Sequence, residues 1–137
     1  MTIKIKATTK RINKSRKALD KYTDEVQAII DRGSNMIRNT AVKSILEHGS
    51  TGVSYGKHTA SLAGNPPNSD TGFLAGNIFI KMDNDRLGAS IESLADYSAS
   101  LEFGTVNMGA RPFLQPAMEE NRKPIRSMYK KVKARGI

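Results

Sequence analysis

The sequence contains no cysteine and no long apolar run, and both absences narrow what the protein can be. Without cysteine there are no disulfides and no thiolate metal sites, and the chain suits assembly in a reducing cytoplasm. No apolar run approaches the ~20 residues that a membrane-spanning helix needs. The basic N-terminus is not followed by an apolar segment, so we expect no secretory signal there. With 137 residues and a hydrophobic fraction of 38%, residues 1–137 are expected to form a single domain with a modest core.

Motifs that carry catalysis are also missing. The chain has no Gly-x-x-x-x-Gly-Lys or Gly-x-Gly-x-x-Gly phosphate loop and no Gly-x-Ser-x-Gly nucleophile turn. Its two histidines, His48 and His58, have no partner at metal-ligand spacing. The triplet Asp70–Gly72 matches that of aspartic proteases, but polar residues precede it where those enzymes have an apolar strand. We therefore interpret it as a capped turn, and we expect a protein that is not an enzyme and needs no cofactor or metal.

Positive charge gathers at the two ends of the chain. The formal net charge is +9; residues 1–21 and 122–137 each carry +7, and residues 22–121 carry −5. Basic clusters of this kind suit a phosphate backbone or an acidic protein neighbour. A solvated helix face that keeps the protein soluble explains them equally well. The candidate contacts to channel DNA or to an acidic partner are Lys10, Arg11, Lys14, Lys17, Lys130, Lys131 and Lys133.

The first third of the chain predicts a strand followed by a long helix. Residues 2–7 alternate between apolar and basic side chains, which is typical of a strand. Over residues 10–48 the apolar side chains recur at helical spacing, and no proline interrupts them. Thr8 or Thr9 is placed to cap this helix, and Gly33 is the expected kink or break within it. Because the apolar stripe continues across Gly33, we favour one long helix.

A polar segment, Gly49–Asp70, follows this helix and is rich in glycine, serine and threonine. A loop of about twenty residues is longer than compact domains usually tolerate without a purpose. Such a segment is either mobile in the free protein and ordered only in an assembly, or a linker, and in a protein that assembles into a ring we would expect the former. Its candidate contacts are Tyr55, His58, Pro66, Pro67 and Asp70.

The next stretch predicts one helical turn and a β-hairpin. Residues 71–76 form the turn, with Asp70 or Thr71 as its cap. Residues 78–82 alternate as a strand, and residues 86–93 return as a second strand.

An aromatic-rich elbow, Tyr97–Ala117, organises the rest of the chain. Its first part is a short amphipathic helix that is expected to end at Gly104, since glycine accepts the left-handed conformation that ends helices. Pro112 then favours an extended conformation at Arg111. Two helical pieces are thus joined by a rigid, irregular connection.

A basic helix over about residues 115–134 is expected after the elbow. Pro116 suits its first turn, where a missing N–H costs nothing. Pro124 lies inside it and should kink it or split it in two.

The elbow has two interpretations. In the first, Phe103, Phe113 and Leu114 fill the core while Glu102 and Arg111 pair locally. In the second, the same irregular aromatic segment is a docking surface. The candidate assembly contacts are Tyr97, Glu102, Phe103, Gly104, Thr105, Arg111, Pro112 and Phe113.

Together these elements predict an α+β fold. A small antiparallel β-sheet of three or four strands would pack against a long N-terminal helix and a C-terminal helix.

Two blocks of the chain also carry a resemblance. The first is Tyr97…Leu101-Glu102-Phe103-Gly104-Thr105…Ala110-Arg111-Pro112-Phe113-Leu114…Pro116-Ala117, and the second is Pro66-Pro67-Asn68-Ser69-Asp70-Thr71-Gly72-Phe73-Leu74. In their order and spacing they resemble a family of small neck or tail-component proteins of long-tailed bacteriophages and prophages. The first sixty residues match only in being helical and basic.

This resemblance implies a structural, non-enzymatic protein that acts in head–tail joining or tail completion as a subunit of a ring on the DNA channel. Its partners would be further copies of itself, neighbouring neck and tail proteins and, through non-specific contact, channel DNA, with no membrane involved. It would be found in the virion after assembly in the host bacterial cytoplasm. The alternative is a sequence-independent DNA-binding protein that uses its basic N- and C-terminal helices.

Overall fold

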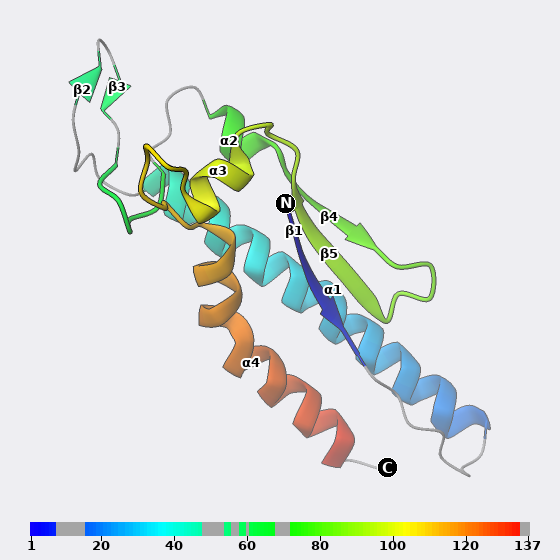
Figure 1. Cartoon of the computed structure of the whole chain (residues 1–137). Coiled ribbons are helices and arrows are strands. Elements are labelled where there is room, and N and C mark those ends of the chain that lie inside the picture. The colour runs from blue at the N-terminus through cyan, green and yellow to red at the C-terminus, as the bar shows by residue number, and fades with distance from the viewer. Residues whose placement is uncertain (8–15, 48–53, 56–57, 60, 68–71, 135–137) are drawn as a thin grey trace.

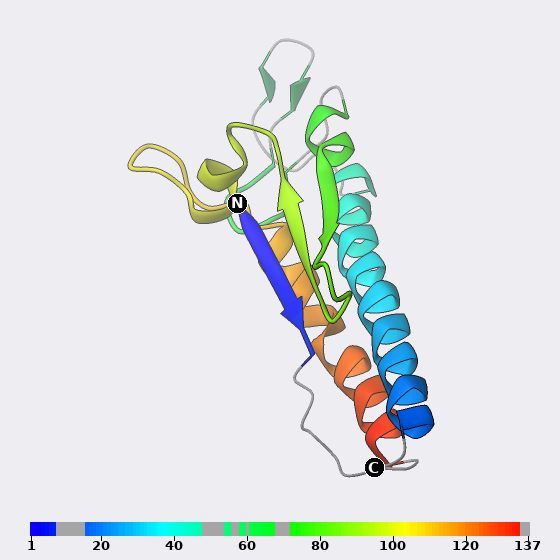
Figure 2. The same cartoon turned by 90° about the vertical axis from the view of Figure 1, so that its right-hand side faces the viewer.

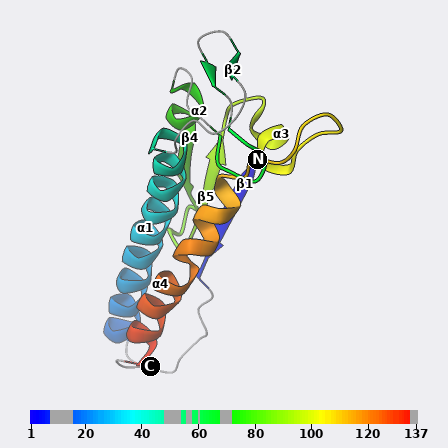
Figure 3. The same cartoon turned by 90° about the vertical axis from the view of Figure 1, so that its left-hand side faces the viewer.

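The computed structural model confirms the α+β architecture (Figure 1). It describes residues 1–7, 16–47, 54–55, 58–59, 61–67 and 72–134. A three-stranded antiparallel sheet packs against the long N-terminal helix α1, Arg16–Glu47, and the C-terminal helix α4, Leu114–Ala134. Both helices lie on the same face of the sheet, side by side, which leaves the other face of the sheet open (Figure 2, Figure 3).

The sheet is built from the N-terminal strand and the predicted hairpin. Its central strand is β5, Gly88–Ser93, with β1, Thr2–Lys6, on one side and β4, Ile78–Met82, on the other. Both outer strands run antiparallel to β5.

The register of the sheet places one apolar row against the helices. Ile91 of β5 lies opposite Ile3 of β1 and opposite Ile80 of β4. Since successive side chains of a strand point to opposite faces, Lys4 and Lys6 of β1 lie on the open face. The predicted alternation of the first strand is therefore confirmed.

The β4–β5 hairpin is also confirmed, but its second strand begins later than expected. Arg86 has a φ of 57°, in the left-handed region. Its backbone N–H donates to the carbonyl of Asp83 at 2.9 Å, and the Asp85 carboxylate accepts the N–H of Leu87 at 2.9 Å. Because a left-handed residue cannot continue a strand, β5 starts at Gly88.

The prediction of one long helix is confirmed, and Gly33 does not break it. The 32 residues of α1 span ~48 Å at ~1.5 Å per residue. A Cβ on Gly33 would lie 3.1 Å from the side chain of Ile125 on α4 and 3.2 Å from that of Ile5 on β1. Gly33 is thus where α4 and β1 approach α1 closely, which offsets the ~1 kcal/mol that glycine costs in a helix. Residues 8–15, with the predicted caps, lie outside the described residues.

The main core lies between the sheet, the two long helices and the elbow. Ile37 and Ile45 come from α1, Ile78 and Ile91 from the sheet, and Phe113 from the elbow, and none of them is more than 1% exposed. Each such side chain contributes ~1.5–3 kcal/mol when it is fully buried.

A second, smaller cluster lies toward the N-terminal end of α1. There the hydroxyls of Tyr22 on α1 and Tyr129 on α4 lie 3.2 Å apart. Burial raises the pKa of Tyr22 to about 12, and the hydrogen bond to Tyr129 acts in the same direction. Tyr22 therefore stays neutral at physiological pH and joins the start of α1 to the end of α4.

Helix α4 is continuous rather than split. It starts at Leu114, one residue before the predicted start, with Pro116 in its first turn. Pro124 lies inside it, and both Pro124 and Glu120 are exposed. On this exposed side of α4, water can reach the carbonyl that loses its N–H partner at Pro124, so the helix need not break there.

The predicted loop at residues 49–70 holds a short two-stranded ladder, which corrects the expectation of an irregular segment. Strand β2, Ser54–Tyr55, pairs antiparallel with β3, His58–Thr59, so that Tyr55 lies opposite His58. Two residues per strand are too few to show alternation in the sequence. Asp70 lies outside the described residues.

The predicted helical turn after this segment is present as α2, Phe73–Gly76, with a different cap. Its N-cap is Gly72, with a φ of 78° and no side-chain hydrogen bond. The carbonyl of Gly72 accepts the N–H of Gly76 at 2.9 Å. The left-handed Gly72 thus takes the N-cap position, and the predicted caps, Asp70 and Thr71, lie outside the described residues.

Candidate functional site

The elbow is built around a buried carboxylate. Glu102 lies in α3, Ser98–Phe103, and is 4% exposed. Its Oε2 accepts the backbone N–H groups of Phe113 at 2.8 Å and Leu114 at 3.0 Å, and its Oε1 accepts that of Gln115 at 2.7 Å. These N–H groups at the start of α4 have no partner within the helix, and the helix dipole favours a negative charge there. Glu102 thus caps α4 from a different helix and fixes the elbow.

The predicted local pair between Glu102 and Arg111 is wrong, because the backbone of α4 takes the carboxylate instead. Arg111 joins the elbow to the segment that precedes α2. Its Nε donates to the carbonyl of Ser61 at 2.9 Å, and the N–H of Gly64 donates to the carbonyl of Ala110 at 2.7 Å. The two sequence blocks that carry the resemblance also lie close together, since the rings of Phe73 and Tyr97 are 6.3 Å apart.

The two phenylalanines of the elbow have opposite environments. Phe113 is 1% exposed and belongs to the core with Leu114, as the first interpretation expects. Phe103, in contrast, is 74% exposed, so that interpretation is wrong for this residue. Pro112, which directly precedes Phe113, is half-buried. Of the predicted contacts, Glu102 and Phe113 thus serve the fold itself.

An apolar tip, which we define as Phe103 and Val106, stands at the outer side of the elbow. Val106 is fully exposed. Gly104 ends α3 with a φ of 77°, and a Cβ on it would lie 2.8 Å from the carbonyl of Met108, so the turn requires glycine here. The exposed Thr105 donates its N–H to Met108 at 2.8 Å, which closes the turn. Figure 2 shows this turn projecting from the body of the molecule.

Further apolar side chains are exposed near the same end of the molecule. The rings of Phe73 on α2 and Tyr97 at the start of α3 lie 6.3 Å apart, and about half of each side chain is exposed. Leu94, between β5 and α3, is 60% exposed. Sequence reasoning singled out Tyr97 and missed Leu94 and Val106, because residue type alone does not show which apolar side chains the fold leaves in water.

The opposite end of the molecule is basic. The start of α1 and the end of α4 lie together there (Figure 1, Figure 3). We define the basic end by its exposed side chains, which are Lys21, Lys123, Arg126, Lys130 and Lys131. Lys17 and Lys133 lie on α1 and α4 toward this end, whereas Lys10, Arg11 and Lys14 lie outside the described residues.

Within the described residues, no group of three or more histidines, aspartates and glutamates is arranged to hold a metal ion. No helix in the part of the chain that the structure describes is long and apolar enough to cross a membrane. No family model, curated protein or solved structure matches the chain.

Proposed function

We propose that this protein is a structural subunit of a ring in the neck or tail of a long-tailed bacteriophage. In this proposal it acts in head–tail joining or tail completion, without catalysis, cofactor or metal. Its partners are further copies of itself and neighbouring neck and tail proteins, and it resides in the virion after assembly in the host bacterial cytoplasm. The proposal starts from the resemblance of residues 66–74 and 97–117 to small neck or tail-component proteins.

The observation that supports it most strongly is the apolar tip on a fixed base. Glu102 and Phe113 hold the elbow from inside, while Phe103 and Val106 remain in water. Burial of either exposed side chain in an interface would contribute ~1.5–3 kcal/mol. Exposed apolar residues on a firmly held loop are typical of an assembly contact.

The two ends of the molecule also suit a ring. A subunit of a ring meets its two neighbours through two different, complementary faces. The apolar tip would provide one of these two faces. The basic end, which includes Lys130 and Lys131, would instead meet channel DNA or an acidic ring above or below.

Replacing the tip residues with acidic ones tests the proposal. We expect Phe103→Asp and Val106→Asp to fold normally, because both side chains are exposed, and to lose assembly because a charge cannot enter an apolar contact. The variants are tested by complementation of a phage that lacks the gene. For the double variant we expect the yield of infectious particles to fall at least ~100-fold, which corresponds to a loss of about 2.7 kcal/mol of contact energy.

A matched control comes from the sheet. Phe79 on β4 is also exposed, at 47%, but belongs neither to the apolar tip nor to the basic end, so Phe79→Asp should complement normally. Full complementation by the double tip variant, with the control equally active, would contradict a role of the tip in assembly.

The segment Gly49–Asp70 is proposed to become protected only in the assembled particle. Its central ladder, β2–β3, is short, and a two-stranded hairpin alone is marginally stable. Limited proteolysis should cleave the segment in the free protein at least ~10-fold faster than in purified particles, because burial in an interface suppresses local opening. Equal cleavage rates in both samples would refute ordering on assembly.

The alternative function is sequence-independent binding of DNA through the basic end. The exposed Lys123, Arg126, Lys130 and Lys131 favour it, since phosphate contacts by lysine and arginine need no base-reading motif. Binding of the free protein to duplex DNA that weakens steeply with salt, together with normal assembly by the tip variants, would favour this alternative.

A further inference from the structure

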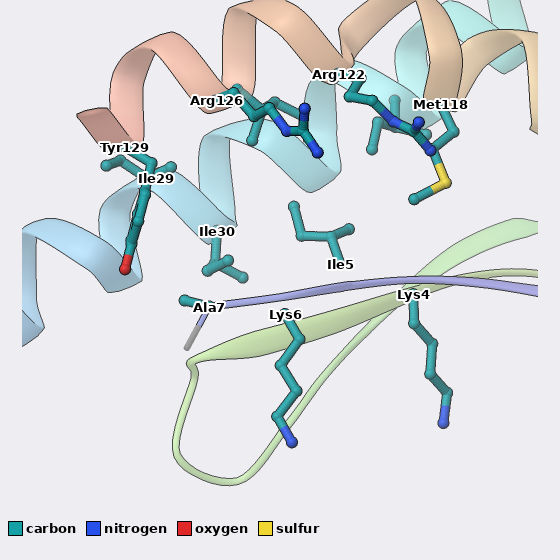
Figure 4. Close-up of a pocket in the computed structure, with 12 residues that line it drawn as sticks. Lys4, Ile5, Lys6, Ala7, Ile29, Ile30, Met118, Arg122, Arg126 and Tyr129 are labelled. Carbon is teal, nitrogen blue, oxygen red and sulfur yellow. The ribbon is translucent and has the colours of Figure 1, made fainter. Parts of the chain in front are cut away.

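An open groove lies between the edge strand β1 and helix α4. Its volume is about 520 Å³. Its lining is largely apolar and includes Ile5 of β1 and Ile125 of α4. Helix α1 contributes Ile29, Ile30 and Ile37. Figure 4 shows Ile5 pointing into this space, while Arg122 and Arg126 extend from α4 toward β1.

The backbone of β1 presents hydrogen-bonding groups along this groove. β1 is an edge strand, and the backbone N–H and C=O groups of its odd-numbered residues point toward β5. At its two ends, the carbonyl of Met1 accepts the N–H of Ser93, and the N–H of Ala7 donates to the carbonyl of Leu87. In an antiparallel ladder these contacts alternate along the strand. The N–H and C=O groups of Lys4 and Lys6 therefore point away from β5, where they can pair with another strand.

Within the described residues, the charged residues that border the groove are all basic. Arg122 and Arg126 extend toward it from α4, whereas Lys4 and Lys6 border it with their backbone and point their side chains to the opposite, open face of the sheet (Figure 4). Arg122 pairs with Glu119 at 3.1 Å, whereas Arg126 makes no salt bridge within the described residues. No acidic residue is among the described residues that line the groove.

We infer that this groove binds an extended acidic and apolar segment of a partner protein, which adds as a fourth strand along β1. The partner's apolar side chains would enter the groove and its acidic side chains would lie beside Lys4 and Lys6, since the side chains of an added strand alternate between the two faces. The inference does not depend on the proposed role in a phage ring.

The length of the bound segment follows from the geometry. The groove extends along α4 from Met118 to Tyr129, which is ~16 Å at ~1.5 Å per residue. An extended chain covers this distance with about five residues at ~3.3 Å each. β1 itself has five residues, so strand and groove match in length.

A second copy of this chain is a poor occupant. Its own edge strand β4 exposes Lys81, which would lie near Lys4 and Lys6 if the two edges paired. Like charges on neighbouring strands are destabilising. Charge complementarity therefore favours a different protein with an acidic segment.

The test uses the full chain and a capped hexapeptide, Asp-Val-Asp-Ile-Asp-Val, in an NMR titration. We expect saturable shifts of the backbone amides of Lys4 and Lys6, whose N–H groups would gain partners. Two further peptides carry N-methyl groups on either the aspartates or the aliphatic residues. Because an added strand directs only alternate N–H groups to β1, only one of these two peptides should lose binding.

Charge-reversal variants separate specific binding from general attraction. Lys4→Glu should weaken binding at least about tenfold, because Lys4 would lie beside the aspartates, whereas Lys123→Glu, which changes the net charge equally outside the groove, should weaken it less than about twofold.

Three results would overturn the inference. The first is no saturable binding up to millimolar peptide, and the second is an equal effect of the two variants or of the two methylated peptides. The third is self-association of the protein that protects the amides of Lys4 and Lys6, because the groove would then hold a second copy.

Discussion

Replacing Phe113 with alanine is expected to lower the free energy of unfolding by about 3–5 kcal/mol. The side chain is 1% exposed and packs in the main core beside Leu114 and Ala117. Alanine would lose the transfer free energy of the ring and leave a cavity between the elbow and the sheet, since the surrounding elements can relax only partly. Urea unfolding followed by circular dichroism measures the change.

Phe103 provides the matched control within the same elbow. It is 74% exposed, so Phe103→Ala should change the free energy of unfolding by no more than about 0.5 kcal/mol. A comparable loss of stability for both variants would mean that Phe103 is buried in solution, which contradicts the apolar tip.

Removing the carboxylate of Glu102 is expected to have the second largest effect. Glu102→Ala leaves the N–H groups of Phe113, Leu114 and Gln115 without their partner and removes a charge from the start of α4. We expect a loss of about 2–4 kcal/mol, because hydrogen bonds to a charged group contribute ~1.5–3 kcal/mol and a helix cap ~1 kcal/mol, partly offset by water entering the site.

Two variants sharpen this test. Glu102→Gln should lie between the wild type and Glu102→Ala, because the amide keeps only one acceptor oxygen and turns its NH₂ toward the N–H groups of α4. Glu119→Ala, at an exposed position of the same helix, should change stability by less than about 0.5 kcal/mol. If Glu102→Ala lowered the free energy of unfolding no more than Glu119→Ala does, the hydrogen bonds of the Glu102 carboxylate would not be what fixes the elbow.

Sequence periodicity predicted the elements that repeat a simple pattern. The alternating apolar and basic residues of β1 and the helical stripe of α1 are confirmed, and so is the hairpin of β4 and β5. These features follow from local geometry, because a strand repeats every two residues and a helix every 3.6. The fold class followed from their order.

Contacts between distant residues could not be predicted in the same way. Gly33 was expected to kink or break α1, yet it lets Ile125 approach from almost a hundred positions away in the sequence. Glu102 was expected to pair with the nearby Arg111, whereas it caps α4. In both cases a tertiary contact overrides the local preference, and no single sequence shows which contact forms.

The candidate site was predicted in part. The elbow was recognised as a unit, and Lys130 and Lys131 of the C-terminal helix are exposed. Which phenylalanine is buried was left open, and Val106 and Leu94 were missed. An apolar residue at the surface resembles a core residue in the sequence, so only the fold identifies the apolar tip.

The most direct test of the proposed function is electron microscopy of a lysate from phage with an early stop codon in the gene for this chain. The proposal predicts DNA-filled heads beside separate tails, and joining should be restored when the purified protein is added. Whether heads or tails accept the added protein would place it on one side of the neck. Normal infectious particles without the protein would contradict the proposed function and would favour binding of DNA through the basic end.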